Sequence, residues 1–263
     1  MIEDAAREQP PKVLVVLPTY NERENIARML PALCQLPVAN LHILIVDDNS
    51  PDGTGELADE LAQQPDYAGR LNVLHRPHKQ GLGPAYIAGF KRALAMDADV
   101  IIGMDADFSH QPERIPAMLQ RARDCDIVIG SRYVPGGSVD SNWGAWRKLL
   151  SFWANRVYTP LILGLPLRDA TGGFRVFHRA ALTGIDLDRV RSNGYVFLVE
   201  LVYVAHRLGY TIGEVPIHFP DRQHGQSKMS SRIALEAALR VWQIRWRHRR
   251  LSRADRRTRP DVL

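Results

Sequence analysis

Residues 99–107 read Asp-Val-Ile-Ile-Gly-Met-Asp-Ala-Asp, an apolar run that ends in two aspartates. The run from Val100 to Met104 is typical of a strand that is buried on both faces of a sheet. Pro112, a few residues further on, predicts the first turn of a helix. This stretch therefore predicts a strand that leads through a polar turn into a helix, which is the repeating unit of α/β proteins.

Similar units surround this stretch. Four more apolar runs predict strands at Val13–Leu17, Leu41–Val46, Leu71–Leu74 and Ile127–Ile129. Helical patterns follow the first three of them, at Asn25–Leu33, Thr54–Leu61 and Pro84–Ala95. Continuous Val, Ile and Leu strands that alternate with helices indicate an α/β, mostly parallel sheet with helices on both faces. In such sheets ligands bind at the carboxyl ends of the strands.

The second half of the chain is less regular. Helical patterns run from about Trp146 to Leu163 and from Tyr195 to Arg207, a strand is predicted at Thr211–Val215, and a last helix begins near Ser231. We therefore expect a flexible N-terminus (1–11), one α/β domain (12–230), an amphipathic basic helix (231–251) and a disordered tail (252–263).

Composition excludes several classes of protein. Of the 263 residues, 45% are hydrophobic and 24% are charged, which excludes a disordered chain or a collagen-like repeat. No apolar run reaches the roughly 18 residues of a spanning helix, and the N-terminal segment lacks the apolar core of a secretory signal. Two cysteines without CxxC spacing, Cys34 and Cys125, argue against a disulfide framework or a zinc site and favour a reducing compartment.

The net charge of +5 is concentrated at the C-terminal end. From Arg232 to Leu263 the chain has ten arginines against three acidic residues, so this segment carries +7 and the preceding residues carry −2. Such a segment predicts contact with an anionic surface, either a membrane or a nucleic acid. The acidic body and the lack of a recognisable reading motif argue against nucleic acid.

Asp105 and Asp107 are the sharpest functional signal. In an extended segment their carboxylates would point the same way, because side chains alternate with a period of two. Two like charges at close range need a counter-cation, and carboxylate oxygens suit Mg²⁺ or Mn²⁺. The alternative is a loop in which the two aspartates cap the next helix.

A second polar cluster, Asp47-Asp48-Asn-Ser-Pro-Asp52-Gly53, follows the second strand. An acidic residue at this place can accept hydrogen bonds from a nucleoside. The string is also strongly turn-forming, with Gly53 at positive φ and Asp52 at the start of the next helix.

Gly81 and Gly83 resemble a phosphate-binding loop only weakly, because Tyr86 stands where a third glycine is expected. A close turn before a helix is the better interpretation of both glycines.

Three other segments offer groups that bind anions. Arg132 follows the fifth strand and is either a partner of a diphosphate or a solvated surface residue. The two glycines within Asp169–Arg175 indicate either a close approach to a ligand or a hairpin. The loop Arg222–Lys228 has the composition of an anion-binding nest or of a flexible polar loop.

Six motifs in order carry a resemblance to a known family. They are Leu-Pro18-Thr-Tyr20-Asn-Glu22, Val-Asp47-Asp48-Asn-Ser-Pro-Asp52-Gly-Thr, Met-Asp105-Ala-Asp107-Phe-Ser-His-Gln-Pro, Gly-Ser-Arg132-Tyr, Asp169-Ala-Thr-Gly-Gly-Phe-Arg and Arg222-Gln-His-Gly-Gln-Ser227-Lys228. Together they resemble a family 2 glycosyltransferase of the dolichol-phosphate (polyprenol-phosphate) mannosyltransferase type, over residues 12–230. The resemblance implies a GT-A (Rossmann-like) fold, GDP-mannose as donor, a polyprenyl phosphate acceptor, a divalent metal (Mg²⁺ or Mn²⁺) and inversion at the anomeric carbon.

The resemblance also implies roles for individual residues. The nucleotide pocket is expected to be lined by Pro18, Tyr20, Glu22 and Asp48. Asp105 would face the nucleotide and the metal, and Asp107 would be the firmest metal ligand. The diphosphate and the acceptor phosphate would be held by Arg132, Arg222 and Lys228, with Ser227 in support. Ser109 stands where some relatives have a glutamine that joins the metal, so we expect no third protein ligand there.

A polyprenyl acceptor implies a membrane, and two segments suit its surface. The C-terminal helix carries Trp242 and Trp246 among several arginines, and the stretch from Trp143 to Ile162 also combines aromatic and basic residues. We therefore expect a peripheral protein on the cytoplasmic face of the cell membrane. The alternatives are tryptophans packed on the domain, or recruitment by a separate membrane protein.

Two further functions stay open on the sequence. The same chemistry with UDP-glucose or another nucleotide sugar would use the same residues. A non-catalytic, membrane-associated, nucleotide-binding subunit is less consistent with an intact pair of aspartates and intact cations at Arg222 and Lys228.

Overall fold

The computed structural model describes residues 9–220 and 231–258, with side chains described over 9–220 and 238–258. A seven-stranded sheet has the order β3-β2-β1-β4-β7-β5-β8, and β6 pairs with β9 in a separate small sheet. The strands are β1 (Val13–Thr19), β2 (Leu41–Asp47), β3 (Leu71–His75), β4 (Val100–Gly103), β5 (Ile127–Ser131), β6 (Ser138–Val139), β7 (Arg175–His178), β8 (Ile212–Pro216) and β9 (His218–Phe219).

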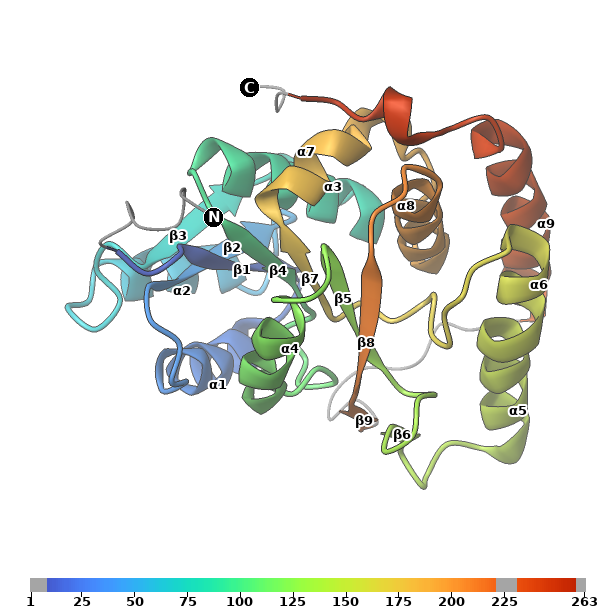
Figure 1. Cartoon of the computed structure of the whole chain (residues 1–263). Helices are drawn as coiled ribbons and strands as arrows, with labels where there is room; N and C mark the ends of the chain where they lie inside the picture. Colours follow the sequence, from blue (N-terminus) through green and yellow to red (C-terminus); the bar gives the residue numbers. More distant parts are fainter. Residues whose placement is uncertain (1–8, 221–230, 259–263) are drawn as a thin grey trace.

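Helices cover both faces of the large sheet (Figure 1). The helices are α1 (Arg23–Cys34), α2 (Thr54–Ala62), α3 (Leu82–Ala95), α4 (Ile115–Arg121), α5 (Ala145–Trp153), α6 (Thr159–Leu163), α7 (Arg179–Ile185), α8 (Tyr195–Arg207) and α9 (Ser231–His248). Alternate residues of β1 explain this arrangement: Val13, Val15 and Leu17 pack with α1, α2 and α4, whereas Leu14 and Val16 pack with α3, α7 and α8. The predicted parallel sheet with two covered faces is therefore confirmed.

The order of the strands reverses beside β1. Strand β1 pairs in parallel with β2 on one side and with β4 on the other. A crevice outside the carboxyl ends of such strands is the usual ligand site of open α/β sheets. The polar residues after β1, β2 and β4 therefore meet at one edge.

Strand β7 and helix α7 were not predicted. β7 runs antiparallel between β4 and β5, directly after the turn that we expected at Asp169–Arg175. Its apolar run consists only of Val176 and Phe177, and it begins with the fully buried Arg175, so it lacks the continuous apolar pattern of the other strands.

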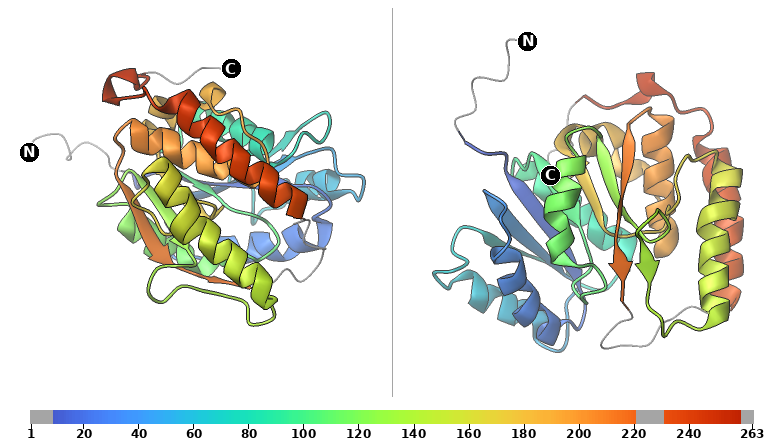
Figure 2. Two further views of the ribbon diagram at one scale, coloured as in Figure 1. Left: turned by 90° about the vertical axis from the view of Figure 1, so that its right-hand side faces the viewer. Right: turned by 60° about the horizontal axis from the view of Figure 1, so that its bottom comes forward.

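The long helix predicted from Trp146 to Leu163 is interrupted at its centre. Helices α5 and α6 are joined by a π-helical turn, Ala154–Tyr158, and Gly164 ends α6 at a φ of 66°. The side chain of Asn155 in this turn is buried; its Nδ2 donates to Ser151 O (3.0 Å) and its Oδ1 accepts from the backbone N of Thr171 (3.1 Å). Helices α5, α6 and α9 stack against the end of the sheet beside β8, and α9 lies along α6 (Figure 2).

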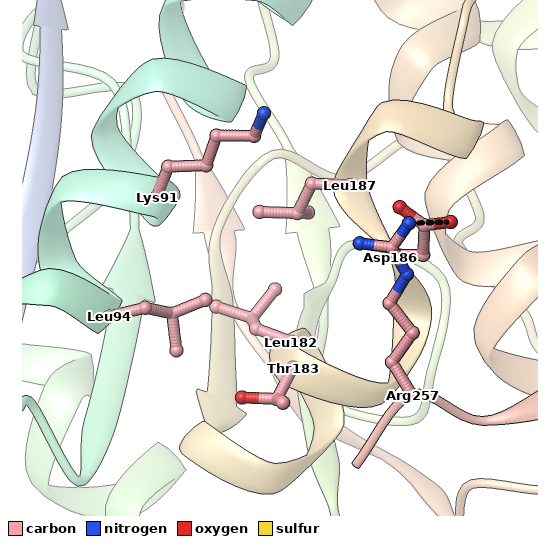
Figure 3. Close-up of a pocket in the computed structure, with 7 residues that line it drawn as sticks. All are labelled: Lys91, Leu94, Leu182, Thr183, Asp186, Leu187 and Arg257. Carbon is pink, nitrogen blue, oxygen red and sulfur yellow. Dashed lines mark ion pairs between the residues drawn. The ribbon is translucent and has the colours of Figure 1, made fainter. Parts of the chain in front are cut away.

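The described part of the C-terminal tail is ordered, which differs from the disorder predicted for residues 252–263. Ser252 caps a short 3₁₀ turn, and the Arg256 guanidinium donates to Leu208 O and Gly209 O (2.8 Å each). Arg257 pairs with Asp186 (3.2 Å) beside a crevice of about 10 Å³, the size of a single water (Figure 3). Arginine–carbonyl bonds thus hold residues 252–258 to the body, and for residues 259–263, which lie outside the described ranges, disorder stays a prediction.

No helix within the described ranges combines the length and the apolar character that crossing a bilayer requires.

Candidate active site

The turn after β2 is organised by Asp47. Its carboxylate accepts hydrogen bonds from Thr19 Oγ1 (3.0 Å), from Ser50 N (3.0 Å) and from Ser50 Oγ (2.6 Å). Gly53 has a φ of 79°, and Asp52 Oδ1 accepts from Thr54 N at the start of α2 (3.0 Å). The turn-forming interpretation is thus confirmed for this part of the cluster.

Asp48 is buried and forms an ion pair with Arg76, a residue that the sequence did not single out. The second nitrogen of that guanidinium donates to Gln80 Oε1 (2.8 Å), and Arg76 N donates to Asp47 O (2.8 Å). The Asp48 carboxylate, which we expect to face the nucleotide, is therefore held by Arg76, directly after β3. Arg76 is in turn held by Gln80, in the segment that precedes α3.

The other residues expected at the nucleotide pocket lie in or directly after β1. Pro18 pairs in register with Val46, and the Lys79 ammonium lies 3.5 Å above the Tyr20 ring. Glu22 donates its backbone N–H to Thr54 Oγ1 (3.0 Å), and its carboxylate accepts from Asn25 Nδ2 (2.6 Å). The turns after β1 and β2 are thus cross-linked into one polar edge. Neither Lys79 nor Arg76 lies in a sequence pattern that would have marked it as a residue of the site.

Asp105 and Asp107 lie beyond the end of β4. The strand ends at Gly103 and the aspartates follow in a bent segment, so the alternation expected of an extended strand does not apply to them. The carboxylate of Asp107 accepts from Ser109 N (3.0 Å) and Ser109 Oγ (2.6 Å). Ser109 therefore binds the Asp107 carboxylate through both its backbone N–H and its hydroxyl.

Asp105 is held by two residues from different parts of the chain. Its Oδ1 accepts a hydrogen bond from the Tyr86 hydroxyl (2.9 Å), and its backbone N donates to His110 Nδ1 (2.9 Å). Burial and then the nearby Asp105 carboxylate raise the pKa of Tyr86 well above its usual value, so the phenol keeps its proton and donates.

The donor set of this segment fits a hard divalent cation. Two carboxylates one residue apart follow β4, and the described part of the chain contains no cluster of three His, Cys, Asp or Glu side chains that could hold a metal. Mg²⁺ and Mn²⁺ are commonly bound by one or two carboxylates, with water and substrate phosphates as the remaining ligands. Asp105 and Asp107 are the residues that fit this pattern.

The Arg132 side chain is only 9% exposed and pairs with Asp169, so the solvated alternative was wrong. Its Nε and Nη2 donate to the two carboxylate oxygens of Asp169 (2.7 Å each), and Nη2 also donates to Thr171 Oγ1 (2.7 Å). Burial alone would lower the pKa of Arg132, but the Asp169 carboxylate outweighs it and raises that pKa above its usual value. Asp169 is itself fully buried, with no surface exposed to solvent.

The turn that carries Asp169 is packed against protein. A Cβ at Gly172 would meet Gly130 O at 3.0 Å, and one at Gly173 would meet the His110 ring at 3.0 Å. The Arg175 guanidinium is fully buried and donates to the carbonyls of Gly172, Leu198 and Ala170 (2.7–2.8 Å); burial lowers its pKa to about 10. These two glycines therefore allow close packing within the chain.

Phe219 brings the two halves of the site together. Its ring lies edge-on to that of His110, which follows the aspartate pair (5.7 Å between centroids), and the Arg132 guanidinium lies 5.3 Å from its centre. The segment after β4 and the end of β5 therefore share one wall. Arg222, Ser227 and Lys228 lie outside the described residues, so their roles stay predictions.

An open, mostly apolar groove lies next to this wall. It has a volume of about 510 Å³ and is lined by Tyr133, Val139, Lys148, Leu149 and Phe152. The Tyr133 hydroxyl and Ser151 Oγ are joined by a 2.6 Å hydrogen bond, so the residue after Arg132 is tied to α5.

At the groove and beyond it, α5, the π-helical turn, α6 and α9 expose large apolar side chains. We call these side chains the aromatic face; they are Trp146, Leu149, Phe152, Trp153, Val157, Leu161, Leu239, Trp242 and Trp246. Leu161 is 76% exposed and Trp146 is 73% exposed, which excludes packing on the domain for these residues. Trp143, in contrast, is buried beneath Arg147, whose guanidinium lies 3.6 Å from its ring centre.

Comparison with known proteins places these features in context. Residues 14–185 match the model of a family described as Glycosyl transferase family 2. The chain is 47% identical over 236 residues to an undecaprenyl-phosphate mannosyltransferase of Micrococcus luteus (89% of this chain, 93% of the relative). It is 45% identical over 250 residues to a polyprenol monophosphomannose synthase of Mycolicibacterium smegmatis (93% and 92%). A dolichol-phosphate mannosyltransferase of Pyrococcus furiosus is 36% identical over 238 residues, which are 89% of this chain and 63% of that protein.

Solved structures with the same fold are more distant in sequence. A mannosyl-3-phosphoglycerate synthase from Rubrobacter xylanophilus has a TM-score of 0.63 at 19% identity, over 91% of this chain and 75% of that chain. A glucosyl-3-phosphoglycerate synthase from Mycobacterium tuberculosis, in complex with Mn²⁺ and uridine diphosphate, has a TM-score of 0.62 at 19% identity, over 90% and 80%. These likenesses confirm the predicted GT-A-like fold.

Proposed function

The chain belongs to glycosyl transferase family 2, and from this premise we propose that it transfers mannose from GDP-mannose to polyprenyl phosphate. The products are polyprenyl-phosphate mannose and GDP. The observation that carries the proposal is the shared wall at the carboxyl ends of β4 and β5, where His110, directly after the aspartate pair, and Arg132 both contact Phe219. The identities of 47% and 45% to two polyprenyl-type mannosyltransferases support the acceptor and the sugar.

The chemistry needs little proton transfer. An oxygen of the acceptor phosphate, already an anion near neutral pH, attacks the anomeric carbon while the bond from that carbon to the diphosphate oxygen breaks. Attack from the face opposite the leaving group inverts the configuration. No side chain is therefore assigned as a general base.

The residues of this chain act by positioning and by charge. Asp105 and Asp107 would hold Mg²⁺ or Mn²⁺, which would supply positive charge to offset that of the departing diphosphate. Pro18, Tyr20, Glu22 and Asp48 line the nucleotide pocket. The phosphates are bound by Arg132, Arg222 and Lys228, with Ser227 in support.

We further propose that the protein is peripheral, on the cytoplasmic face of the cell membrane. Trp242 is 54% exposed and Trp246 is 71% exposed, and the chain carries five arginines between residues 240 and 250, three of them in α9 and two directly after it. A helix with aromatic residues and cations is typical of the membrane interface, and each cation near an anionic leaflet contributes about 1 kcal/mol. Recruitment by a membrane protein is the alternative partner for this surface; nucleic acid is not proposed.

A single assay tests the reaction. The purified chain is incubated with a short polyprenyl phosphate, Mg²⁺ or Mn²⁺, and labelled GDP-mannose or UDP-glucose, and the lipid phase is extracted. We expect label in the lipid phase from GDP-mannose only, and its anomeric configuration reports inversion. Label from UDP-glucose only would keep the mechanism and change the donor. No transfer from either donor would contradict the enzyme and favour a non-catalytic subunit.

A further inference from the structure

The Tyr86 side chain extends from α3 to Asp105, beyond the end of β4. The residue lies in α3 and is 1% exposed, with its ring 5.5 Å from that of Phe90 and stacked at 6.1 Å on that of Phe197. A Cβ at Gly103, the last residue of β4, would meet the Tyr86 ring at 3.0 Å. The ring thus lies directly against the end of the strand, where its hydroxyl donates to Asp105 Oδ1 (2.9 Å).

The Tyr86 hydroxyl is not needed to fill space. A phenylalanine would make the same ring contacts with Phe90 and Phe197, whereas a buried hydroxyl costs free energy unless it has a hydrogen-bond partner. Within the described ranges the partner of this hydroxyl is Asp105. A polar group placed at this cost in an otherwise apolar cluster indicates that the carboxylate, rather than the packing, requires it.

His110 holds the backbone of the same aspartate. Its Nδ1 accepts from Asp105 N (2.9 Å), and its ring is stacked on that of Phe174 at 5.3 Å. A Cβ at Gly173 would meet the ring at 3.0 Å, so the glycine allows the ring to lie here without a tight contact. Asp105 is therefore fixed at one carboxylate oxygen and at its amide.

We propose that Tyr86 and His110 are positioning residues, which preset Asp105 to bind a divalent cation with the nucleoside diphosphate. The inference rests on the proposed function, since it takes Asp105 as a ligand of the donor's cation. Outer residues that orient a ligating carboxylate commonly change metal affinity by about 10- to 100-fold when they are removed. Neither residue touches the reacting atoms, so each acts through Asp105.

Removal of the hydroxyl tests the inference directly. In Tyr86→Phe we expect the Kd for Mn²⁺, measured by calorimetry or electron paramagnetic resonance with GDP present, to rise about tenfold or more while the thermal midpoint stays near that of the parent. Tyr210→Phe is the matched control, because it removes a hydroxyl that donates to Ala180 O (3.2 Å) and should leave Mn²⁺ binding unchanged. Equal Mn²⁺ affinity in Tyr86→Phe and the parent overturns the inference.

Two further measurements separate positioning from packing. In an Asp105→Asn background, Tyr86→Phe should add little to the loss of Mn²⁺ affinity; additive losses overturn the inference. His110→Asn keeps an acceptor near the position of Nδ1, whereas His110→Leu removes it, so Asn should retain more Mn²⁺ affinity than Leu. The two His110 variants test the positioning of Asp105 even where Tyr86→Phe folds poorly. Equal Mn²⁺ affinities in His110→Asn and His110→Leu count against the inference.

The inference and the proposed function fail in different ways. A parent chain that binds Mn²⁺ with GDP but transfers no mannose removes the proposed reaction and leaves the role of Tyr86 and His110 to be decided by their variants. A parent that transfers mannose, with Tyr86→Phe equal to it in Mn²⁺ affinity, removes the inference alone. A parent that binds no Mn²⁺ in the presence of GDP overturns the inference.

Discussion

The strand-end site and the aromatic face differ in what they bury. At the site, Asp107 and Asp169 are polar and yet buried, and each accepts several hydrogen bonds from neighbouring residues. On the aromatic face, Trp146 and Leu161 are large and apolar and yet mostly exposed. Charged side chains are mostly exposed and large apolar side chains mostly buried in folded proteins, so both regions depart from the usual distribution. Each departure therefore indicates a ligand.

The contrast separates two kinds of recognition. Buried, hydrogen-bonded charges are set before a ligand arrives, which suits a small anion and its cation. Exposed aromatic rings beside arginines suit a surface that is apolar and anionic at once, such as a lipid bilayer. Substitutions in the two regions should therefore affect different measurements.

The largest effect is expected from Asp107→Asn. The variant loses the charge that we assign to the firmest metal ligand, so kcat/KM for mannose transfer should fall by about 10³-fold, the upper end for loss of one stabilising group. Steady-state assays over a range of Mn²⁺ concentrations measure the fall, while binding to vesicles should be unchanged. Activity near that of the parent would show that Asp107 does not hold the cation.

Asp169→Asn should lower both stability and activity. Arg132 is left buried with a neutral partner, and breaking such a pair from one side costs about 3–5 kcal/mol. Chemical unfolding measures this loss. Asp188→Asn is the control, because its pair with Lys91 is more exposed and should change stability by less than about 1 kcal/mol. Equal stabilities in the two variants would mean that the Arg132 pair adds nothing to folding.

A third effect concerns the attachment of α9 to the body. Glu200 is fully buried in α8 and accepts from His248 Nε2 and Arg247 Nη1 (2.7 Å each) and from Ser192 N (2.6 Å). Burial alone would raise the pKa of Glu200, but these hydrogen bonds lower it from 4.5 to about 2.

Because the folded pKa of Glu200 lies below the unfolded value, this carboxylate stabilises the fold above about pH 4.5, and the stabilisation is lost as the pH falls towards 2. Its size is about 3 kcal/mol. Chemical unfolding at several pH values measures it, with Glu200→Gln as the variant that should lack this part of the pH dependence. An identical pH profile in that variant would assign the acid sensitivity to other groups.

The smallest effect is expected on the aromatic face. Trp242→Ala with Trp246→Ala should weaken binding to anionic vesicles by about tenfold or more, with little change in the thermal midpoint, because both side chains are exposed. Gln243→Ala, on the same helix and also exposed, is the control in a sedimentation assay. Undiminished binding of the double variant would favour a protein partner or another surface.

Much of the site could be predicted from the sequence, because its residues follow strands that are continuous apolar runs. The runs at β1, β2 and β4 place Asp48 and Asp105 at one edge by topology alone. Their partners are different: Arg76 and Tyr86 come from other segments and carry no local pattern, so only the tertiary structure pairs them with these aspartates.

The misses have a common cause. Strand β7 has only two apolar residues in sequence, and the tail at Arg256 is held by carbonyl oxygens, so neither contains the periodic apolar signal that a sequence shows. For Asp105 and Asp107 the sequence left open an extended segment or a loop, and the structure has a bent segment after Gly103.

The π-helical turn between α5 and α6 has a mechanical consequence. Asn155 Oδ1 accepts from Thr171 N, and Thr171 Oγ1 accepts from Arg132 Nη2, so two hydrogen bonds and one short residue connect the helix axis to the guanidinium. Helices α5 and α6 cannot rotate about their long axis without breaking the hydrogen bond between Thr171 N and Asn155 Oδ1. The direction in which the exposed aromatic rings of α5 face is thereby coupled, through Thr171, to the position of the Arg132 guanidinium.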